Sequence, residues 1–187
     1  MLSKYKFDLT SEQWDSIYKF TSQEFQESEN CERNLNPGGI SLSWLKENPL
    51  VTYSELEPIK KLFTESIYHY FEQVHNLIIP SETEFEISDS WFVNVSDPGI
   101  KQPYVPTRVH NHPFSICSGI FYMDDSEHGT MIYSDLKKPH WPFMWEEGEN
   151  LNSDLSTHLV KSEKGTLILF PAETKHSSTI VKGAAGS

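Results

Sequence analysis

Two histidines, His110 and His112, stand one residue apart just ahead of a run of small and apolar residues. On a β-strand, residues i and i+2 share a face, so both imidazoles can reach one metal ion with bonds of about 2.1 Å. A third ligand must come from elsewhere, and His176 is the natural candidate because it follows an apolar strand-like run and a turn at Pro171. Three neutral nitrogens on one side of an ion leave open positions, which suits Fe(II) oxygen chemistry.

A pair of histidines is weak evidence by itself, because surface and capping histidines are more common than metal ligands. Three features strengthen the metal interpretation here. The pair lies in a segment that otherwise reads as a strand, Pro113 directly after it ends the ladder as a rim residue would, and His176 occurs in a later strand. The remaining histidines are expected on helix faces or in loops, without a catalytic role.

The elements that position these histidines follow from the spacing of apolar residues. Up to about residue 80 the spacing is helical: Thr10 and Gln13 form a capping box for a helix to about residue 25, and Ser54 and Glu57 predict a second. The second helix tolerates Pro58 in its first turn and carries a wide apolar stripe, made of Ile59, Leu62, Phe63, Ile67, Tyr70, Phe71 and Val74.

After Pro80 the apolar period becomes two, and turn signals separate short segments. Strands are expected in "EFEISDSWFVNVS", "YVPTRVHNH", "SICSGIFYM", "GTMIYS", "STHLVKS", "KGTLILF" and "KHSSTIVK". Such a series without intervening helices predicts an antiparallel sandwich or barrel. The 187 residues are therefore read as a single domain: a mostly helical part over 1–80, a β core over 81–182 and a tail over 183–187.

Composition narrows the setting in which the protein works. The formal net charge of −12 disfavours nucleic acid and anionic lipid as direct partners. The two cysteines match neither a disulfide framework nor a zinc pattern, and the N-terminus lacks the apolar region of a signal peptide. No apolar run approaches the ~20 residues of a membrane span, so a cytoplasmic protein is expected.

Four motifs, taken in order, resemble the Fe(II)- and 2-oxoglutarate-dependent oxygenases that are distantly related to prolyl hydroxylases. They are "WFVNVSDPG" (91–99), "RVHNHPFSICSGIFYMDD" (108–125), "GTMIYSD" (129–135) and "KGTLILFPAETKH" (164–176), and the resemblance covers about residues 85–180. It implies a mainly β protein with flanking helices, a double-stranded β-helix (jelly roll, cupin-like) with N-terminal helices packed on the major sheet. It also implies Fe(II) as the metal and 2-oxoglutarate as the cosubstrate.

The resemblance assigns metal-ligand roles to His110 and His176, but the first motif departs from the wider superfamily. That superfamily carries His-x-Asp or His-x-Glu, whereas His112 stands at the carboxylate position. His112 is then a third nitrogen ligand, or the position is vacant as in the halogenating members, or a carboxylate such as Asp135 or Glu173 takes its place.

A second departure concerns the anchor for the distal carboxylate of 2-oxoglutarate. Superfamily members commonly carry an Arg or Lys about ten residues after the last histidine, and no Arg follows His176 before the sequence ends in "KGAAGS", read as a truncation or a replaced final strand. Lys182 is one substitute. Arg108 is another, because it lies two residues before His110 and shares its face, and a guanidinium fork matches a carboxylate. Further pocket candidates are Asn94, Tyr104, Ser118 and Tyr122.

Three functions remain open from the sequence. The first is an oxygenase that uses O₂ and hydroxylates a small-molecule or peptide substrate. The second is a cupin-type metal enzyme, although the Glu that cupins carry about four residues after the second histidine is missing in "PFSICSG". The third is a catalytically inactive jelly-roll binding or structural module. A homodimer is one expected assembly, since another chain could supply a final strand.

Overall fold

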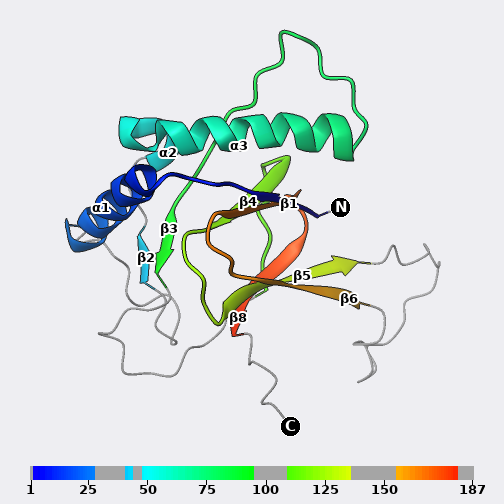
Figure 1. Ribbon diagram of the computed structural model, residues 1–187. Helices are drawn as coiled ribbons and strands as arrows, with labels where there is room; N and C mark the ends of the chain where they lie inside the picture. Colours follow the sequence, from blue (N-terminus) through cyan, green and yellow to red (C-terminus); the bar gives the residue numbers. More distant parts are fainter. Residues whose placement is uncertain (1, 28–40, 44–47, 95–108, 136–154, 181–187) are drawn as a thin grey trace, which may run out of the picture.

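The computed structural model describes residues 2–27, 41–43, 48–94, 109–135 and 155–180, and these form a mainly β protein with flanking helices (Figure 1). The strands are β1 (Ser3–Lys6), β2 (Ser41–Ser43), β3 (Phe92–Asn94), β4 (Cys117–Tyr122), β5 (His128–Asp135), β6 (Leu155–Lys161), β7 (Thr166–Pro171) and β8 (Lys175–Ile180). The helical elements are α1 (Ser11–Glu27), α2 (Pro49–Thr52), the 3-10 turn η1 (Ser54–Leu56), α3 (Glu57–His69) and the π turn η2 (Tyr70–Val74). None of the helices in these ranges has the length and apolar character needed to cross a membrane.

Six of the strands form two antiparallel sheets of three strands each. One sheet has the order β1-β7-β4 and the other β6-β5-β8, while β2 and β3 pair separately. The two larger sheets pack face to face, because Tyr122, Ile168 and Phe170 of the first form one buried cluster with Ile132 of the second. Alternate residues of a strand face the same side, so this cluster defines the interior faces of both sheets.

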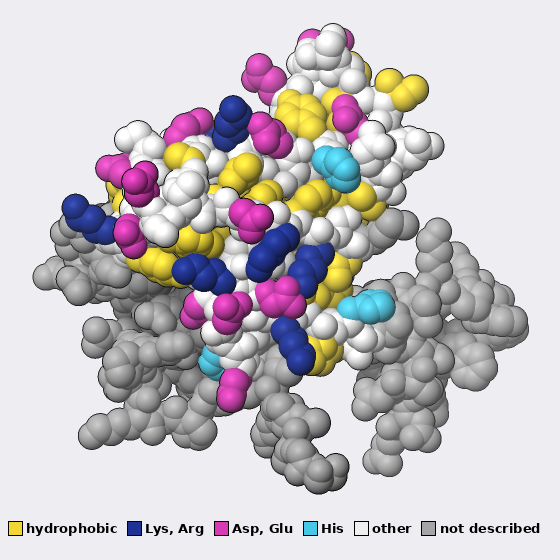
Figure 2. Space-filling view, in the orientation of Figure 1, with side chains coloured by type: hydrophobic (Ala, Val, Ile, Leu, Met, Phe, Trp, Pro, Cys, Tyr) yellow, Lys and Arg dark blue, Asp and Glu magenta, His cyan; other side chains and the backbone are white. Residues whose placement is uncertain are grey.

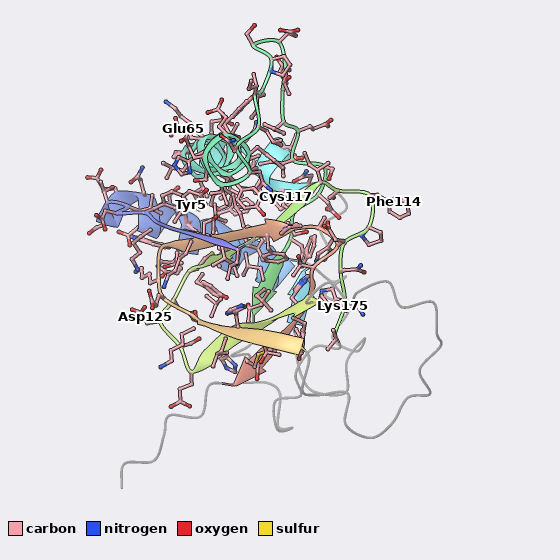
Figure 3. The ribbon with its side chains drawn as sticks, turned by 90° about the vertical axis from the view of Figure 1, so that its right-hand side faces the viewer. Tyr5, Glu65, Phe114, Cys117, Asp125 and Lys175 are labelled. Carbon is pink, nitrogen blue, oxygen red and sulfur yellow. The ribbon has the colours of Figure 1, made fainter. Side chains whose placement is uncertain are left out.

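Helix α3 covers the opposite face of the β1-β7-β4 sheet, giving three layers of helix, sheet and sheet (Figure 3). Leu167 and Leu169, which alternate with the interior residues of β7, pack with Tyr70 and with partly buried residues of the predicted apolar stripe, namely Phe63, Ile67, Phe71 and Val74. The second helix is therefore confirmed, together with the position of Pro58 in its first turn. On the face shown in Figure 2, basic side chains lie among acidic ones.

The two predicted capping boxes have different outcomes. At the first, the Thr10 N–H donates to Gln13 Oε1 at 2.8 Å and the Gln13 N–H donates to Thr10 Oγ1 at 3.3 Å, so the box is confirmed. The second is wrong: a 3-10 turn occupies Ser54–Leu56, and the N-cap of α3 is Leu56, without a side-chain hydrogen bond. Ser54 therefore lies too far ahead of α3 to cap it.

The predicted strands after residue 110 are confirmed as β4 to β8, but the described parts of two earlier ones contain less strand than expected. Of the segment 84–96, only Phe92–Asn94 is a strand among the described residues, because the main chain before it bonds to the start of α2. The segment 104–112 is described only from Val109, and there it forms a single bridge between His110 and His176. Strand β1 was not predicted at all.

Candidate metal centre

Main-chain hydrogen bonds bring the three predicted histidines together. The His110 N–H donates to the His176 carbonyl at 3.0 Å, and the His176 N–H donates to the His110 carbonyl at 2.9 Å. The His112 N–H donates to the carbonyl of Ala172, in the turn before β8, at 3.0 Å. His176 lies in β8, which is paired to β5, so the segment 110–112 is laid along the edge of the β6-β5-β8 sheet.

The three imidazoles converge on one small region. Their ring centroids are 4.4 Å apart for His110 and His176, 5.0 Å for His112 and His176, and 5.1 Å for His110 and His112. The Nε2 atoms of His112 and His176 lie 3.2 Å apart, which corresponds to an angle of about 100° at an ion with bonds of about 2.1 Å. One candidate ligand atom from each ring lies within 4.8 Å of the others.

His176 is held in the orientation that a ligand needs. Its Nδ1 lies 3.1 Å from the Thr174 carbonyl, which can only accept, so Nδ1 carries the hydrogen and Nε2 keeps its lone pair for an ion. The ring is buried and packs at 4.9 Å between centroids against Phe170, a core residue of β7. His110 is exposed and His112 half-buried, so the cluster opens toward solvent on one side.

Burial also keeps the imidazoles of His112 and His176 neutral, as metal ligation requires. The pKa of His176 is lowered to about 4, mainly by burial and also by the neighbouring His110 and His112, against the opposing effect of the Thr174 carbonyl. The pKa of His112 is lowered mainly by burial and then by His110, while the Asp89 carboxylate acts in the opposite direction. At neutral pH both rings therefore offer lone pairs without first losing a proton.

The depressed pKa of His176 predicts a stability change with pH in the metal-free protein. Because the pKa falls from 6.5 to about 4 on folding, its contribution is fully present above pH 6.5 and is lost as pH falls through about 4. The free energy of unfolding should decrease by about 1.4 kcal/mol per pH unit in this window, and by roughly 3 kcal/mol in total. Urea unfolding at pH 6.5, 5.8 and 5.0 measures it, and His176→Gln should flatten the slope; equal slopes would refute the assignment.

The other predicted site residues have separate outcomes. Tyr122 is buried in the sandwich interior, where its hydroxyl donates to Thr130 Oγ1 at 2.7 Å and burial raises its pKa to about 12. Ser118 is half-buried on β4 and shares the face of Tyr122. Glu173 is exposed and does not belong to the histidine cluster. The predictions for Arg108, Tyr104, Lys182 and the side chains of Asn94 and Asp135 fall outside the described residues.

Sequence reasoning missed three residues, two associated with His112 and one in the sandwich interior. The Trp91 ring lies 5.3 Å from the His112 ring between centroids, and Asp89 is close enough to His112 to act on its pKa. Thr166, opposite Tyr122 in the β4–β7 register, is fully buried and its hydroxyl has no hydrogen-bond partner among the described residues. No local pattern marks these positions, since each depends on which segments the fold brings together.

Comparison with known proteins identifies a protein family that matches this chain. The model of a protein family described as "Putative 2OG-Fe(II) oxygenase" matches residues 89–185, which is just over half of the chain and includes all three histidines. A search of curated proteins found no match.

Proposed function

The chain belongs to this 2OG-Fe(II) oxygenase family, and from that premise we propose that it is a non-haem Fe(II)- and 2-oxoglutarate-dependent oxygenase that hydroxylates a small molecule or peptide. The observation that carries the proposal is the cluster of His110, His112 and His176, whose ligand atoms lie within 4.8 Å of one another inside the matched segment. Iron bound there, together with 2-oxoglutarate and O₂, would supply the oxidising power for C–H hydroxylation.

The donor set fits iron as a ligand shell of three neutral nitrogens. His176 presents Nε2 because its Nδ1–H is occupied by the Thr174 carbonyl, and His112 Nε2 lies at the separation of neighbouring ligands. Imidazole suits Fe, Zn and Cu alike, so the site chemistry does not by itself select iron. His112 acts as the third nitrogen ligand in this proposal, in place of the carboxylate of the wider superfamily.

The interior of the sandwich supplies groups that suit the cosubstrate. Tyr122 and Thr130 are joined by a hydrogen bond on the interior faces of the two sheets, and Thr166 lies beside Tyr122 with a hydroxyl that no described residue pairs. A buried hydroxyl without a partner costs free energy, which an acceptor such as a carboxylate oxygen would offset. These residues would hold 2-oxoglutarate by hydrogen bonds, and Arg108 or Lys182 would supply a positive charge.

The same arrangement supports a jelly roll as the complete fold. Two three-stranded antiparallel sheets enclose one core, α3 covers the outer face of one of them, and the histidines lie at one sheet edge. Such a fold places a metal at the mouth of the sandwich, with the interior behind it for the cosubstrate.

Anaerobic titration tests the function directly. Adding Fe(II) and then 2-oxoglutarate under nitrogen should produce a weak visible charge-transfer band, and Tyr122→Phe should weaken 2-oxoglutarate binding by roughly tenfold through loss of a hydrogen bond to a charged group. In air, the wild-type protein should consume 2-oxoglutarate only when iron is present. A folded protein that binds neither metal nor 2-oxoglutarate would instead be a binding module.

A further inference from the structure

The segment that leads into β3 holds Trp91 against the histidine cluster and turns Ser90 away from it. Ser90 points toward α2: its hydroxyl accepts from the Leu50 N–H at 3.1 Å and donates to the side chain of Asn48. Trp91, the next residue, packs against the His112 ring with 5.3 Å between centroids. Anchoring of Ser90 on α2 therefore fixes Trp91 against the histidine cluster.

The chain over 87–91 contains neither helix nor turn, so Asp89 and Trp91, the two neighbours of Ser90, are expected on the side opposite Ser90. The pKa of His112 is lowered by burial and by His110 and is raised by the Asp89 carboxylate, which agrees with this placement. The side chain is exposed, and the ion pairs within the described part of the chain, Lys4 with Glu163 and Lys60 with Glu57, do not include it. An exposed carboxylate and an indole thus flank one histidine of the cluster.

The charges at the site determine which kind of group can bind beside Asp89 and Trp91. Three neutral imidazoles leave the two positive charges of a divalent ion uncompensated, and the two negative charges of 2-oxoglutarate balance them. The carboxylate of Asp89 is then an excess negative charge facing the site. A cation can bind beside these two residues through two interactions. It pairs with a carboxylate within about 4 Å, and it is attracted to an indole face within about 6 Å.

We propose that Asp89 and Trp91 form a subsite for a cationic group of the substrate, an ammonium or guanidinium, held beside the metal centre. The subsite rests on the proposed function for its role in catalysis, although its affinity for cations does not depend on bound metal. It narrows the substrate class to amines and guanidines, or to peptides that present a Lys or Arg side chain near the oxidised position.

Choline and its neutral isostere 3,3-dimethylbutan-1-ol are the probes for this subsite, because they differ only in a quaternary nitrogen that replaces a carbon. Saturation-transfer NMR titrations should show choline binding roughly tenfold more tightly than the neutral isostere. Asp89→Asn and Trp91→Leu should each weaken choline binding roughly fivefold. The matched control is Glu86→Gln, which removes one exposed negative charge three residues away and should leave choline binding unchanged.

Manganese(II) then locates the probe, because a bound paramagnetic ion broadens the choline methyl signal only at short range. Broadening that disappears in Asp89→Asn, with manganese affinity unchanged, supports the subsite. Equal binding of the two probes would overturn it, as would a loss of manganese affinity in Asp89→Asn as large as in a histidine variant, since Asp89 would then be a metal ligand. If manganese does not bind but the Asp89-dependent preference for choline persists, the oxygenase proposal fails and the cation subsite stands.

Discussion

Replacing His176 by glutamine is expected to lower Fe(II) affinity by roughly 100-fold. Structural Zn²⁺ sites with four ligands bind with ~10–16 kcal/mol, which is about 3 kcal/mol for each ligand, and a similar loss is expected here. The effect should exceed that of the same change at His110 or His112. His176 is buried, and the Thr174 carbonyl sets its tautomer, so Nε2 is already oriented for an ion. Anaerobic competition with a chromophoric chelator measures the affinity.

The matched control for this series is His158→Gln, which changes an exposed histidine of β6 that is not in the cluster. It should leave Fe(II) affinity within about twofold of wild type. Circular dichroism and thermal unfolding of each variant show whether its fold is intact, and the half-buried His112 offers a second variant with a smaller packing cost. If His176→Gln and His158→Gln bind Fe(II) with the same affinity, the histidine cluster is not the metal site.

Replacing Phe170 by alanine is expected to reduce the free energy of unfolding by about 3–5 kcal/mol, a large share of the ~5–15 kcal/mol typical of a domain. Phe170 is 1% exposed and belongs to the cluster that joins the two larger sheets. Its ring also packs against His176, so a cavity there removes the support of the most buried of the three candidate ligands. Urea unfolding gives the stability change, and the same chelator competition should show weaker Fe(II) binding.

Phe114→Ala is the control for this change in size. Phe114 is fully exposed in the turn after His112 and points away from the sheets (Figure 3), so removing its ring should alter stability by no more than ~0.5 kcal/mol. Similar losses at Phe114 and Phe170 would mean that the interior between the sheets is not the core of the protein.

The fold was most predictable where the structure depends on residues that are close together in the sequence. The Thr10–Gln13 capping box and the alternating segments of β4 to β8 depend on neighbours in sequence, and these were confirmed. The strand predicted over 84–96 failed, since alternation cannot reveal that Asn48 and Leu50 bind its main chain and side chains in place of a partner strand. The four-residue β1 carries too short a pattern, and its pairing with β7 is a tertiary contact.

The candidate site divides in the same way. The convergence of His110, His112 and His176 was predicted because i, i+2 spacing and antiparallel pairing are general properties of sheets, and the structure brings these rings together. Asp89 and Trp91 were not predicted as site residues, because the contact of Trp91 with His112 depends on the hydrogen bond that holds Ser90 on α2. Thr166 lies in a predicted strand, and the sequence cannot show that no described residue pairs with its hydroxyl, because that depends on its neighbours in the fold.

The reciprocal main-chain bonds between His110 and His176 have a consequence for redesign. Peptide groups, which every residue type except proline shares, set the spacing between these two positions. Exchanging either imidazole for a thiolate or carboxylate would therefore alter the electronic character of the centre while the scaffold keeps its register. Single substitutions at these positions could therefore change which metal the site prefers without changing the main chain around it.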